Sequence, residues 1–182
     1  MSAVVLLLSG GLDSTTIAYL LKTGGRRFHA LGVDYGQAHV AELDYARRTC
    51  AILDVPFHVA TVDPIPGVGE ANVYPARNGV LISLAAVRAL QLGFTTLTIG
   101  CNADDEEDYV DCRAGYLNAW NDVLAFQGLR LEHPFSKMTK GQVVAFAEAL
   151  NVPLDDTRSC YLGGDVACHQ CAACRLRERS CA

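Results

Sequence analysis

The sequence begins with an apolar run that leads directly into a serine- and glycine-rich turn, Ala3-Val4-Val5-Leu6-Leu7-Leu8 followed by Ser9-Gly10-Gly11-Leu12-Asp13-Ser14. An uninterrupted apolar run of this kind is typical of a strand that is buried on both faces of a sheet. The next segment, Asp13–Lys22, has apolar residues at helical spacing and stops at a pair of glycines, which suits a helix C-cap. The start of the chain therefore predicts a strand, a tight loop and a helix.

The same unit recurs along the chain. Further strands are expected at His29–Tyr35, Pro56–Val62, Thr96–Cys101 and about Leu129–Pro134, and further helices at Ala38–Leu53, Asn78–Leu92, about Ala114–Ala125 and Lys140–Leu150. Strands that alternate with helices of this length form parallel sheets. The sequence therefore predicts an α/β fold, a doubly wound, mostly parallel five-stranded sheet with helices on both faces.

Two irregular segments, Asp63–Arg77 and Asn102–Cys112, interrupt this alternation. Segments of this length without periodicity are usually functional loops. In open α/β sheets the ligands bind beyond the carboxyl ends of the strands. We therefore expect one crevice to be faced by three loops, Ser9–Ser14, Asp34–Gln37 and Asn102–Arg113.

Length, composition and charge limit the class of protein. The chain has 182 residues, of which 51% are hydrophobic and 19% charged, and this is typical of one globular domain. Its formal net charge of -5 does not favour direct binding to a nucleic acid. The apolar run Ala3–Leu8 is far shorter than the roughly 20 residues that span a bilayer. We expect a cytoplasmic protein with no membrane contact.

The loop Ser9–Ser14 has the chemistry of an anion site. Between a strand and a helix, free backbone N–H groups and the helix dipole attract an anion, and glycines let the backbone approach it closely. The lysine of a Gly-x-x-x-x-Gly-Lys loop is absent, so the loop suits a pyrophosphate group better than a transferred γ-phosphoryl group. The alternative is a plain tight turn with a serine or aspartate N-cap.

Four of the eight cysteines lie close together near the end of the chain, in the spacing C-x7-C-x2-C-x2-C: Cys160, Cys168, Cys171 and Cys174. Four thiolates complete a tetrahedral zinc site and leave no position open for catalysis, so one structural Zn²⁺ is expected. The clustered spacing favours a metal over disulfides. An iron–sulfur cluster is the alternative, and His169 is either a substitute ligand or an exposed bystander.

The remaining cysteines, Cys50, Cys101, Cys112 and Cys181, are expected to be buried or unpaired thiols. In this organisation residues 1–155 form a nucleotide-binding α/β domain. Residues 156–182 form a zinc-binding segment that packs on the same domain.

The loop Ser9–Ser14 resembles the PP-loop of ATP pyrophosphatases, which cleave ATP between its α and β phosphates to adenylate a substrate. That resemblance implies a Rossmann-like fold of the adenine nucleotide alpha hydrolase type. Further segments resemble the 7-cyano-7-deazaguanine synthases: Asp34-Tyr35-Gly36-Gln37-Ala38-His39 with Glu42, Ala76-Arg77-Asn78, Tyr109-Val110-Asp111-Cys112-Arg113, and Thr157-Arg158-Ser159-Cys160-Tyr161. They occur in the order of that family and span nearly the whole chain.

This resemblance implies an ATP-dependent C–N ligase that acts on 7-carboxy-7-deazaguanine. ATP adenylates the carboxylate, ammonia displaces AMP to give an amide, and a second ATP activates the amide oxygen so that loss of AMP leaves the nitrile 7-cyano-7-deazaguanine. Mg²⁺ and donors such as Lys140 or Arg113 would stabilise the charge of the pyrophosphate. The family is typically dimeric, and free ammonia or a partner must supply the nitrogen.

The resemblance and the loop chemistry together give a set of candidate site residues. Those expected to take part in catalysis are Ser9, Asp13, Ser14 and Lys140. Those expected to bind ATP are Ser9, Gly10, Gly11, Leu12, Asp13, Ser14, Asp34, Tyr35, Gln37 and Gly100. Those expected to bind the substrate are Arg77, Asn78, Asp105, Tyr109, Asp111 and Arg113, and the metal ligands are the four cysteines.

Structural interpretations stay open for several of these residues. The segment Asp34–Gln37 also fits a solvated turn, and Arg77-Asn78 also fits the start of a helix with an exposed charge. Asp111 and Arg113 also fit a surface ion pair. A lysine at the start of a helix, like Lys140, opposes the helix dipole, which favours a contact with phosphate over solvent exposure.

The chain departs from the family pattern after the fourth predicted strand. The family usually has Asp-Tyr-Ser-Gly-Tyr-Pro-Asp-Cys-Arg, whereas this chain has Asp105-Glu106-Glu107-Asp108-Tyr109-Val110-Asp111-Cys112-Arg113. Added negative charge repels a carboxylate substrate. The loop therefore either points to solvent or accepts something other than the usual acid, and it could instead hold extra Mg²⁺. Ala38 also replaces a usual arginine, Arg158 replaces a frequent aromatic residue, and a shortened terminal helix is expected.

Other functions fit the same motifs. A variant could stop at the amide or join the activated base to an amine on a partner molecule. A nucleotide-binding module without turnover is a further alternative, although the complete Ser9–Ser14 loop argues against it. The acidic charge and the lack of a basic domain argue against tRNA thiolation.

Overall fold

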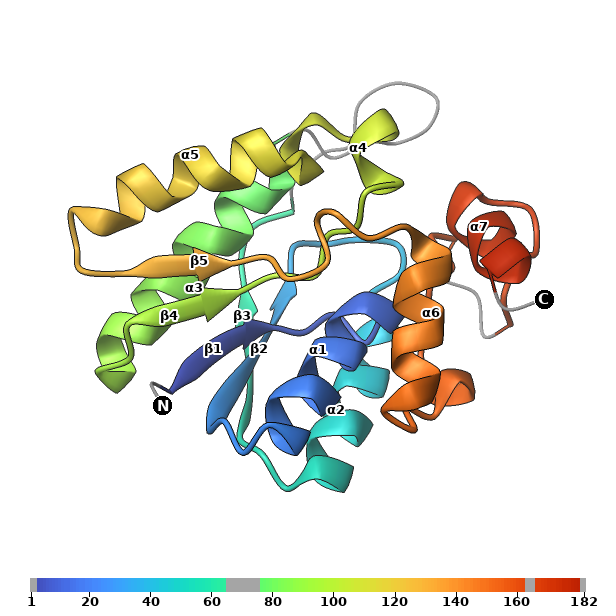
Figure 1. Ribbon diagram of the computed structural model, residues 1–182, viewed down its shortest axis with the longest axis horizontal. Coiled ribbons are helices and arrows are strands. Elements are labelled where there is room, and N and C mark those ends of the chain that lie inside the picture. Colours follow the sequence, from blue (N-terminus) through green and yellow to red (C-terminus); the bar gives the residue numbers. More distant parts are fainter. Residues whose placement is uncertain (1–2, 65–75, 163–165, 181–182) are drawn as a thin grey trace.

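A computed structural model describes residues 3–64, 76–162 and 166–180, which form a three-layered α/β fold (Figure 1). One sheet contains all the strands: β1 (Val4–Leu7), β2 (Phe28–Asp34), β3 (Phe57–Thr61), β4 (Thr96–Thr98) and β5 (Arg130–Glu132). Their order is β3-β2-β1-β4-β5 and every pair is parallel. The predicted five-stranded sheet is confirmed, and it is wholly parallel. Most of the predicted irregular segment 63–77 lies outside the described residues.

Helices cover both faces of the sheet (Figure 1). One face carries α1 (Leu12–Thr23), α2 (Glu42–Leu53) and α6 (Lys140–Ala149), and the other carries α3 (Arg77–Leu92) and α5 (Ala114–Ala125). Alternate residues of β1 enter the two cores, Val4 and Leu6 on the α1 side and Val5 and Leu7 on the α3 side. Because both faces are covered, the central strand is apolar at every position.

The order of the strands creates a switch point between β1 and β4. These strands are neighbours, with Val4 beside Thr96 and Leu6 beside Thr98. The chain leaves β1 through α1, on one face of the sheet, and reaches β4 through α3, on the opposite face. Connections that diverge in this way leave a crevice at the carboxyl ends of the strands, where α/β proteins bind their ligands.

The second helix starts later than predicted. It begins at Glu42 and not at Ala38, because the preceding residues form short turns in which Val40 N donates to Gln37 O (3.1 Å) and Leu43 N to Val40 O (3.0 Å). The side chain of Gln37 supports this path by accepting from Tyr35 N (2.8 Å). Helical periodicity could not reveal these turns, because a side-chain contact with the end of β2 stabilises them.

Short helical elements occur where an irregular segment was expected, namely α4 (Asp105–Asp108) and the 3-10 turn η1 (Val110–Cys112). Another 3-10 turn, η2 (Leu154–Asp156), precedes the cysteine-rich end. The last helix, α7 (Ala172–Ser180), lies beside α6 (Figure 1). Within the described ranges, every helix is too short or too polar to cross a membrane.

Candidate active site and metal centre

A cavity of about 510 Å³ opens at the carboxyl ends of the central strands. Its size falls in the range of about 300–1,000 Å³ that is usual for small-molecule sites. It is lined by many of the residues that the sequence singles out: Ser9, Gly11, Leu12, Asp13, Ser14, Tyr35, Arg77, Asn78, Gly100, Asp105, Tyr109 and Lys140. Residues from loops and helices far apart in the sequence therefore meet at the predicted crevice.

Three of the predicted ATP-binding residues, Gly10, Asp34 and Gln37, do not line the cavity. Each of them makes contacts within the fold instead. Asp34 Oδ1 accepts from Gly36 N (3.0 Å) in a local turn. Gln37 is buried and its Nε2 donates to Val33 O (3.1 Å). Gly10 has a φ of +91°, and a Cβ at this position would lie 2.2 Å from Glu42 O, so only glycine permits this close approach of α2.

Asp111 and Arg113 also lie outside the cavity lining. The carboxylate of Asp111 accepts from Asn78 N (2.9 Å) and so satisfies a backbone donor at the start of α3. Arg113 is exposed, and its Nε donates to Glu106 O (3.1 Å). The ion pairs found among the described residues do not include an Asp111–Arg113 pair.

Two serine hydroxyls hold the first loop at the start of α1. Ser9 Oγ accepts from Gly11 N (3.1 Å), and Ser14 Oγ lies 3.2 Å from Ser9 Oγ, so the two hydroxyls fix the loop. Gly11 occupies the N-cap of α1 and no side chain caps this helix end. A Cβ on Gly100 would lie 2.9 Å from Ser14 N, so the end of β4 presses closely on the loop. A helix start of this kind suits a bound anion.

A buried ion pair lies beside this loop. Lys140 Nζ is 2.7 Å from Asp13 Oδ1, and both side chains are about nine-tenths buried. Asn102 Nδ2 donates to Asp13 Oδ2 (2.9 Å) and to Asp105 Oδ2 (2.8 Å) and thus links two carboxylates. Burial and the nearby charge of Asp13 raise the pKa of Asp105 to about 6. Asp104 Oδ2 accepts from Lys140 N (2.7 Å), which offsets the unfavourable lysine at the start of α6.

The part of the cavity beside the start of α2 holds a second group of titratable side chains. Burial raises the pKa of Glu42 to about 8, although Arg77 and Arg158 act in the other direction. Burial and the charge of Arg77 lower the pKa of His39 to about 4. His39 Nε2 lies 3.7 Å from Glu42 Oε1, and the ring centroids of His39 and Tyr161 are 5.7 Å apart. Both His39 and most of Glu42 are therefore uncharged at pH 7.

Two buried thiols, Cys101 and Cys112, lie beside Asn78 near the start of α3. Asn78 Nδ2 is 3.3 Å from Cys112 Sγ and 3.7 Å from Cys101 Sγ. A hydrogen bond with Cys112, followed by burial, raises the pKa of Cys101. Cys50 is also buried as expected, in the core under α2, and Cys181 lies outside the described residues.

Sequence reasoning assigned no role to several residues of the cavity and its ion-pair network: His39, Glu42, Asn102, Asp104, Arg158, Ser159 and Tyr161. Most of them stand in the motifs that resemble the synthase family, so the motifs themselves were the available signal. Asn102 and Asp104 lie in the irregular segment after the fourth strand and had no such signal.

Glu106, one of the acidic residues at which the chain departs from the family pattern, has a structural role. Asp105 lines the cavity. Glu106 Oε1 instead accepts from Ala114 N (2.9 Å) at the start of α5. Of the added acidic residues, Glu106 thus satisfies a backbone donor within the fold.

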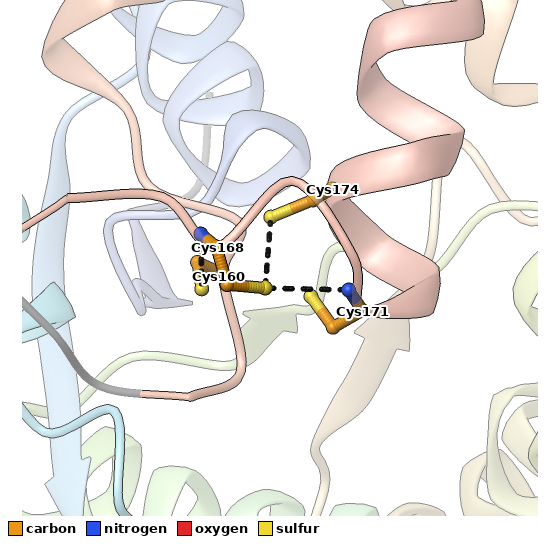
Figure 2. A group of neighbouring side chains, drawn as sticks. All are labelled: Cys160, Cys168, Cys171 and Cys174. Carbon is orange, nitrogen blue, oxygen red and sulfur yellow. Dashed lines mark hydrogen bonds between the residues drawn. The ribbon is translucent and has the colours of Figure 1, made fainter.

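The four predicted metal ligands come together where the tail folds back on itself (Figure 2). Their sulfur atoms all lie within 4.8 Å of one another, and Cys168 Sγ is 3.9 Å from Cys174 Sγ. A tetrahedral site with metal–sulfur bonds of about 2.3 Å needs sulfur–sulfur distances of about 3.8 Å. The cluster therefore fits a single metal ion. His169 lies outside it and pairs with Glu178.

Backbone donors prepare this cluster for a thiolate. Gln170 N and Cys171 N lie 3.4 Å and 3.3 Å from Cys168 Sγ. These two hydrogen bonds lower the pKa of Cys168 to about 6. Since a metal binds the thiolate and not the thiol, the fold favours the ligating form at Cys168, whereas burial raises the pKa of Cys174 to about 12.

The sequence is similar to that of known proteins. The family model for "Queuosine biosynthesis protein QueC" matches residues 3–74 and 66–182. The 7-cyano-7-deazaguanine synthase of Caldicellulosiruptor bescii is 34% identical over 197 residues, which cover 95% of this chain and 89% of that protein.

Solved structures share the fold. The U34-tRNA thiolase NcsA from Methanococcus maripaludis with its [4Fe-4S] cluster has a TM-score of 0.61 at 18% identity, over 98% of this chain and 64% of that one. The NH3-dependent NAD synthetase from Campylobacter jejuni has a TM-score of 0.59 at 21% identity, over 86% of this chain and 67% of that one. The expected fold type is thus confirmed, and the chain belongs to the QueC family of queuosine biosynthesis proteins.

Proposed function

We propose that this protein is an ATP-dependent C–N ligase that converts 7-carboxy-7-deazaguanine, with ammonia, to the nitrile 7-cyano-7-deazaguanine. The observation that carries the proposal is the joining of two kinds of site in one cavity. The open start of α1 and the Asp13–Lys140 pair line one part of it, and the uncharged His39 and Glu42 line the part beside the start of α2. The first part suits the phosphates of ATP, and the second suits a polar, flat base.

The first half of the reaction makes an acid reactive. A carboxylate oxygen of the substrate attacks the α-phosphorus of ATP, and pyrophosphate departs with the electrons of the broken P–O bond. The loop N–H groups and Lys140 hold the departing charge, which grows in the transition state. Ammonia then attacks the acyl carbon, AMP leaves with the C–O electron pair, and loss of a proton gives the amide.

The second half repeats the activation on the amide. The amide oxygen attacks the α-phosphorus of a second ATP and pyrophosphate leaves again. The nitrogen then loses its protons as AMP departs with the former amide oxygen, and a carbon–nitrogen triple bond remains. The same phosphate-binding loop can serve both halves because each half breaks the same bond of ATP.

We also infer that Asp13 and Asp105 hold Mg²⁺ when ATP is bound. Magnesium prefers oxygen ligands and is usually held by one or two carboxylates together with the phosphates of a substrate. The two carboxylates are joined through Asn102 beside the phosphate loop, so the donor set fits. The ion would neutralise part of the pyrophosphate charge.

For the cysteine cluster we propose one structural Zn²⁺. Sulfur atoms within 4.8 Å of one another suit a single ion. An iron–sulfur cluster, the alternative, would separate its cysteines more widely because several iron atoms stand between them. Cys171→Ser should lose close to one equivalent of zinc and lower the thermal stability. Unchanged zinc content, or visible absorbance of an iron–sulfur cluster in the wild type, would contradict the proposal.

Further proposals concern partners, location and organisation. Exposed apolar residues on α3 and α5, including Val87, Leu90 and Phe126, support a homodimer, which light scattering can test. The net charge of -5 supports a small-molecule substrate over nucleic acid. Four thiols that must stay reduced support a cytoplasmic location. We retain residues 1–155 as the nucleotide domain and residues 156–182 as the metal-binding segment.

Mass spectrometry of the product tests the main proposal. The protein is incubated with 7-carboxy-7-deazaguanine, ATP, Mg²⁺ and ammonium, and the mass of the nitrile is expected together with AMP and pyrophosphate. Accumulation of the amide, or of a conjugate with an added amine, would assign the variant reactions. ATP binding without release of pyrophosphate would assign a module without turnover.

A further inference from the structure

The loop at residues 158–161 touches the phosphate loop directly. Arg158 N donates to Gly10 O (2.9 Å), and a Cβ on Gly11 would lie 3.4 Å from Arg158 O. The guanidinium of Arg158 also lies over the ring of Tyr45 on α2, 5.9 Å from its centroid. Arg158, Ser159 and Tyr161 line the cavity. This loop is therefore a wall of the proposed ATP site.

The same loop carries one of the metal ligands. Cys160 lies between Ser159 and Tyr161, and its sulfur accepts from Cys168 N (3.4 Å). Its neighbour Tyr161 stacks at a tilt against His39, so the loop also contacts the end of β2. A metal bound to Cys160 would thus fix the positions of its neighbours Ser159 and Tyr161, which line the cavity.

Arg177 on α7 holds the start of this loop. Its Nη1 donates to Thr157 O and to Thr157 Oγ1, both at 2.9 Å, and its Nη2 donates to Leu154 O. Arg177 stands three residues after Cys174, hence on the same face of the helix. A metal bound by the four cysteines would fix the position of α7. Arg177 on α7 binds the backbone just before Arg158.

The tail packs beside α6 but buries few of its side chains fully. In the described part of residues 166–180, Cys174 is the one fully buried side chain. A helix of nine residues with so little buried apolar surface has only marginal stability by itself. Loss of the metal should therefore free the loop from its anchor at Cys160 and from its contact with Arg177, while the sheet and its two cores remain.

We propose that metal binding by the four cysteines sets the affinity of the phosphate loop for ATP, and that Arg177 is a positioning residue which transmits this effect through residues 158–161. The inference rests on the proposed function in that ATP is the ligand. By thermodynamic linkage the effect is reciprocal, so ATP must strengthen metal binding by the same factor by which the metal strengthens ATP binding.

Calorimetric titration with ATP and Mg²⁺ tests the first half of the proposal. Arg177→Gln should keep its Zn²⁺ yet weaken ATP binding about 3- to 30-fold, the range expected for a change along a coupling network. Arg177→Lys, which keeps one donor, should recover part of this loss. Arg47→Gln is the matched control, because Arg47 forms an exposed pair with Asp44 on α2, away from the tail. Wild-type affinity in Arg177→Gln would overturn the role of Arg177.

A competition with a chelator tests the reciprocal half without any measure of activity. Zn²⁺ affinity is measured with and without saturating ATP, and ATP affinity with and without Zn²⁺; both ratios should exceed one and agree. Hydrogen exchange of the peptide spanning residues 157–161 should rise when Zn²⁺ is removed. Equal ATP binding by the metal-loaded and metal-free protein would overturn this inference alone. If the metal-loaded wild type binds no ATP, the proposed function fails and the inference fails with it.

Discussion

Two parts of the cavity hold buried carboxyl groups in opposite states of charge. At the phosphate end, Asp13 lies 2.7 Å from Lys140 and accepts a further hydrogen bond from Asn102, so its charge is paired. At the other end, burial keeps Glu42 largely protonated at pH 7, since its pKa is raised to about 8. The carboxylate of Asp13 thus keeps its charge and is paired, while the carboxyl group of Glu42 is largely neutral although Arg77 and Arg158 lie nearby.

This contrast matches the two kinds of ligand in the proposed reaction. ATP brings several negative charges, and a paired lysine with open backbone donors can receive them without leaving an uncompensated charge before ATP binds. A neutral carboxyl group and a neutral imidazole can form hydrogen bonds with a base without attracting or repelling the phosphates. The distribution of charge would therefore orient both substrates in one cavity.

The largest expected effect comes from breaking the charge pair. Lys140→Met should leave Asp13 buried without its partner and lower the free energy of unfolding by about 3–5 kcal/mol. The double variant Asp13→Asn/Lys140→Met should regain part of that loss, because neither charge remains. Urea unfolding of the three proteins measures this. Equal stabilities of the single and double variants would show that the unpaired charge of Asp13 does not destabilise the fold.

A slightly smaller effect is expected from Asp13→Asn, which preserves shape and removes the charge. ATP–pyrophosphate exchange should fall roughly 100- to 1,000-fold, the usual cost of a lost electrostatic contact to a transition state. Asp34→Asn is the control, since Asp34 lies outside the cavity lining and closes a local turn. Normal exchange in Asp13→Asn, with a normal circular dichroism spectrum, would remove the phosphate end from the mechanism.

The neutral end is tested by the pH dependence of stability. The folded-state pKa of Glu42, about 8, lies above its ordinary value of 4.5, so the folded protein binds a proton that the unfolded chain has released. Its contribution is fully present below pH 4.5 and is lost as the pH rises through 8. Glu42→Gln removes this loss, so its stability relative to the wild type should increase between pH 5 and pH 8, by at most about 1.4 kcal/mol per pH unit.

Urea unfolding at several pH values measures this difference. Glu148→Gln, at an exposed position of α6, serves as the control and should stay parallel to the wild type. A constant difference between Glu42→Gln and the wild type across this range would mean that Glu42 is charged in the folded protein. The two ends of the cavity would then not differ as described.

The smallest effect is expected outside the cavity. Arg113 is exposed and donates to a backbone carbonyl of α4. Arg113→Gln should therefore change the exchange rate by less than about twofold, because exposed contacts contribute little. A loss comparable to that of Asp13→Asn would show that Arg113 moves into the site when substrates bind.

Local patterns in the sequence were enough to predict the strands and helices. They were also enough to predict the phosphate loop and the cysteine cluster. The apolar run before Ser9 predicts the central strand, because a strand covered on both faces must be apolar throughout. The glycines and serines after it predict the phosphate loop, and the cysteine spacing predicts the cluster, because each depends on residues that are close in the chain. The alternation of strands and helices along the chain predicts the five-stranded sheet. It also predicts that three loops meet at one crevice.

The direction of individual side chains depended on contacts between distant parts of the chain. Asp111 and Gln37 were expected at the ligands, yet they satisfy backbone groups of α3 and β2. Arg158 reaches the phosphate loop only because the tail folds back over Gly10. Periodicity in a sequence reports which face of an element is buried. It carries no information on where a loop side chain points, since that direction is set by contacts that form only in the folded chain.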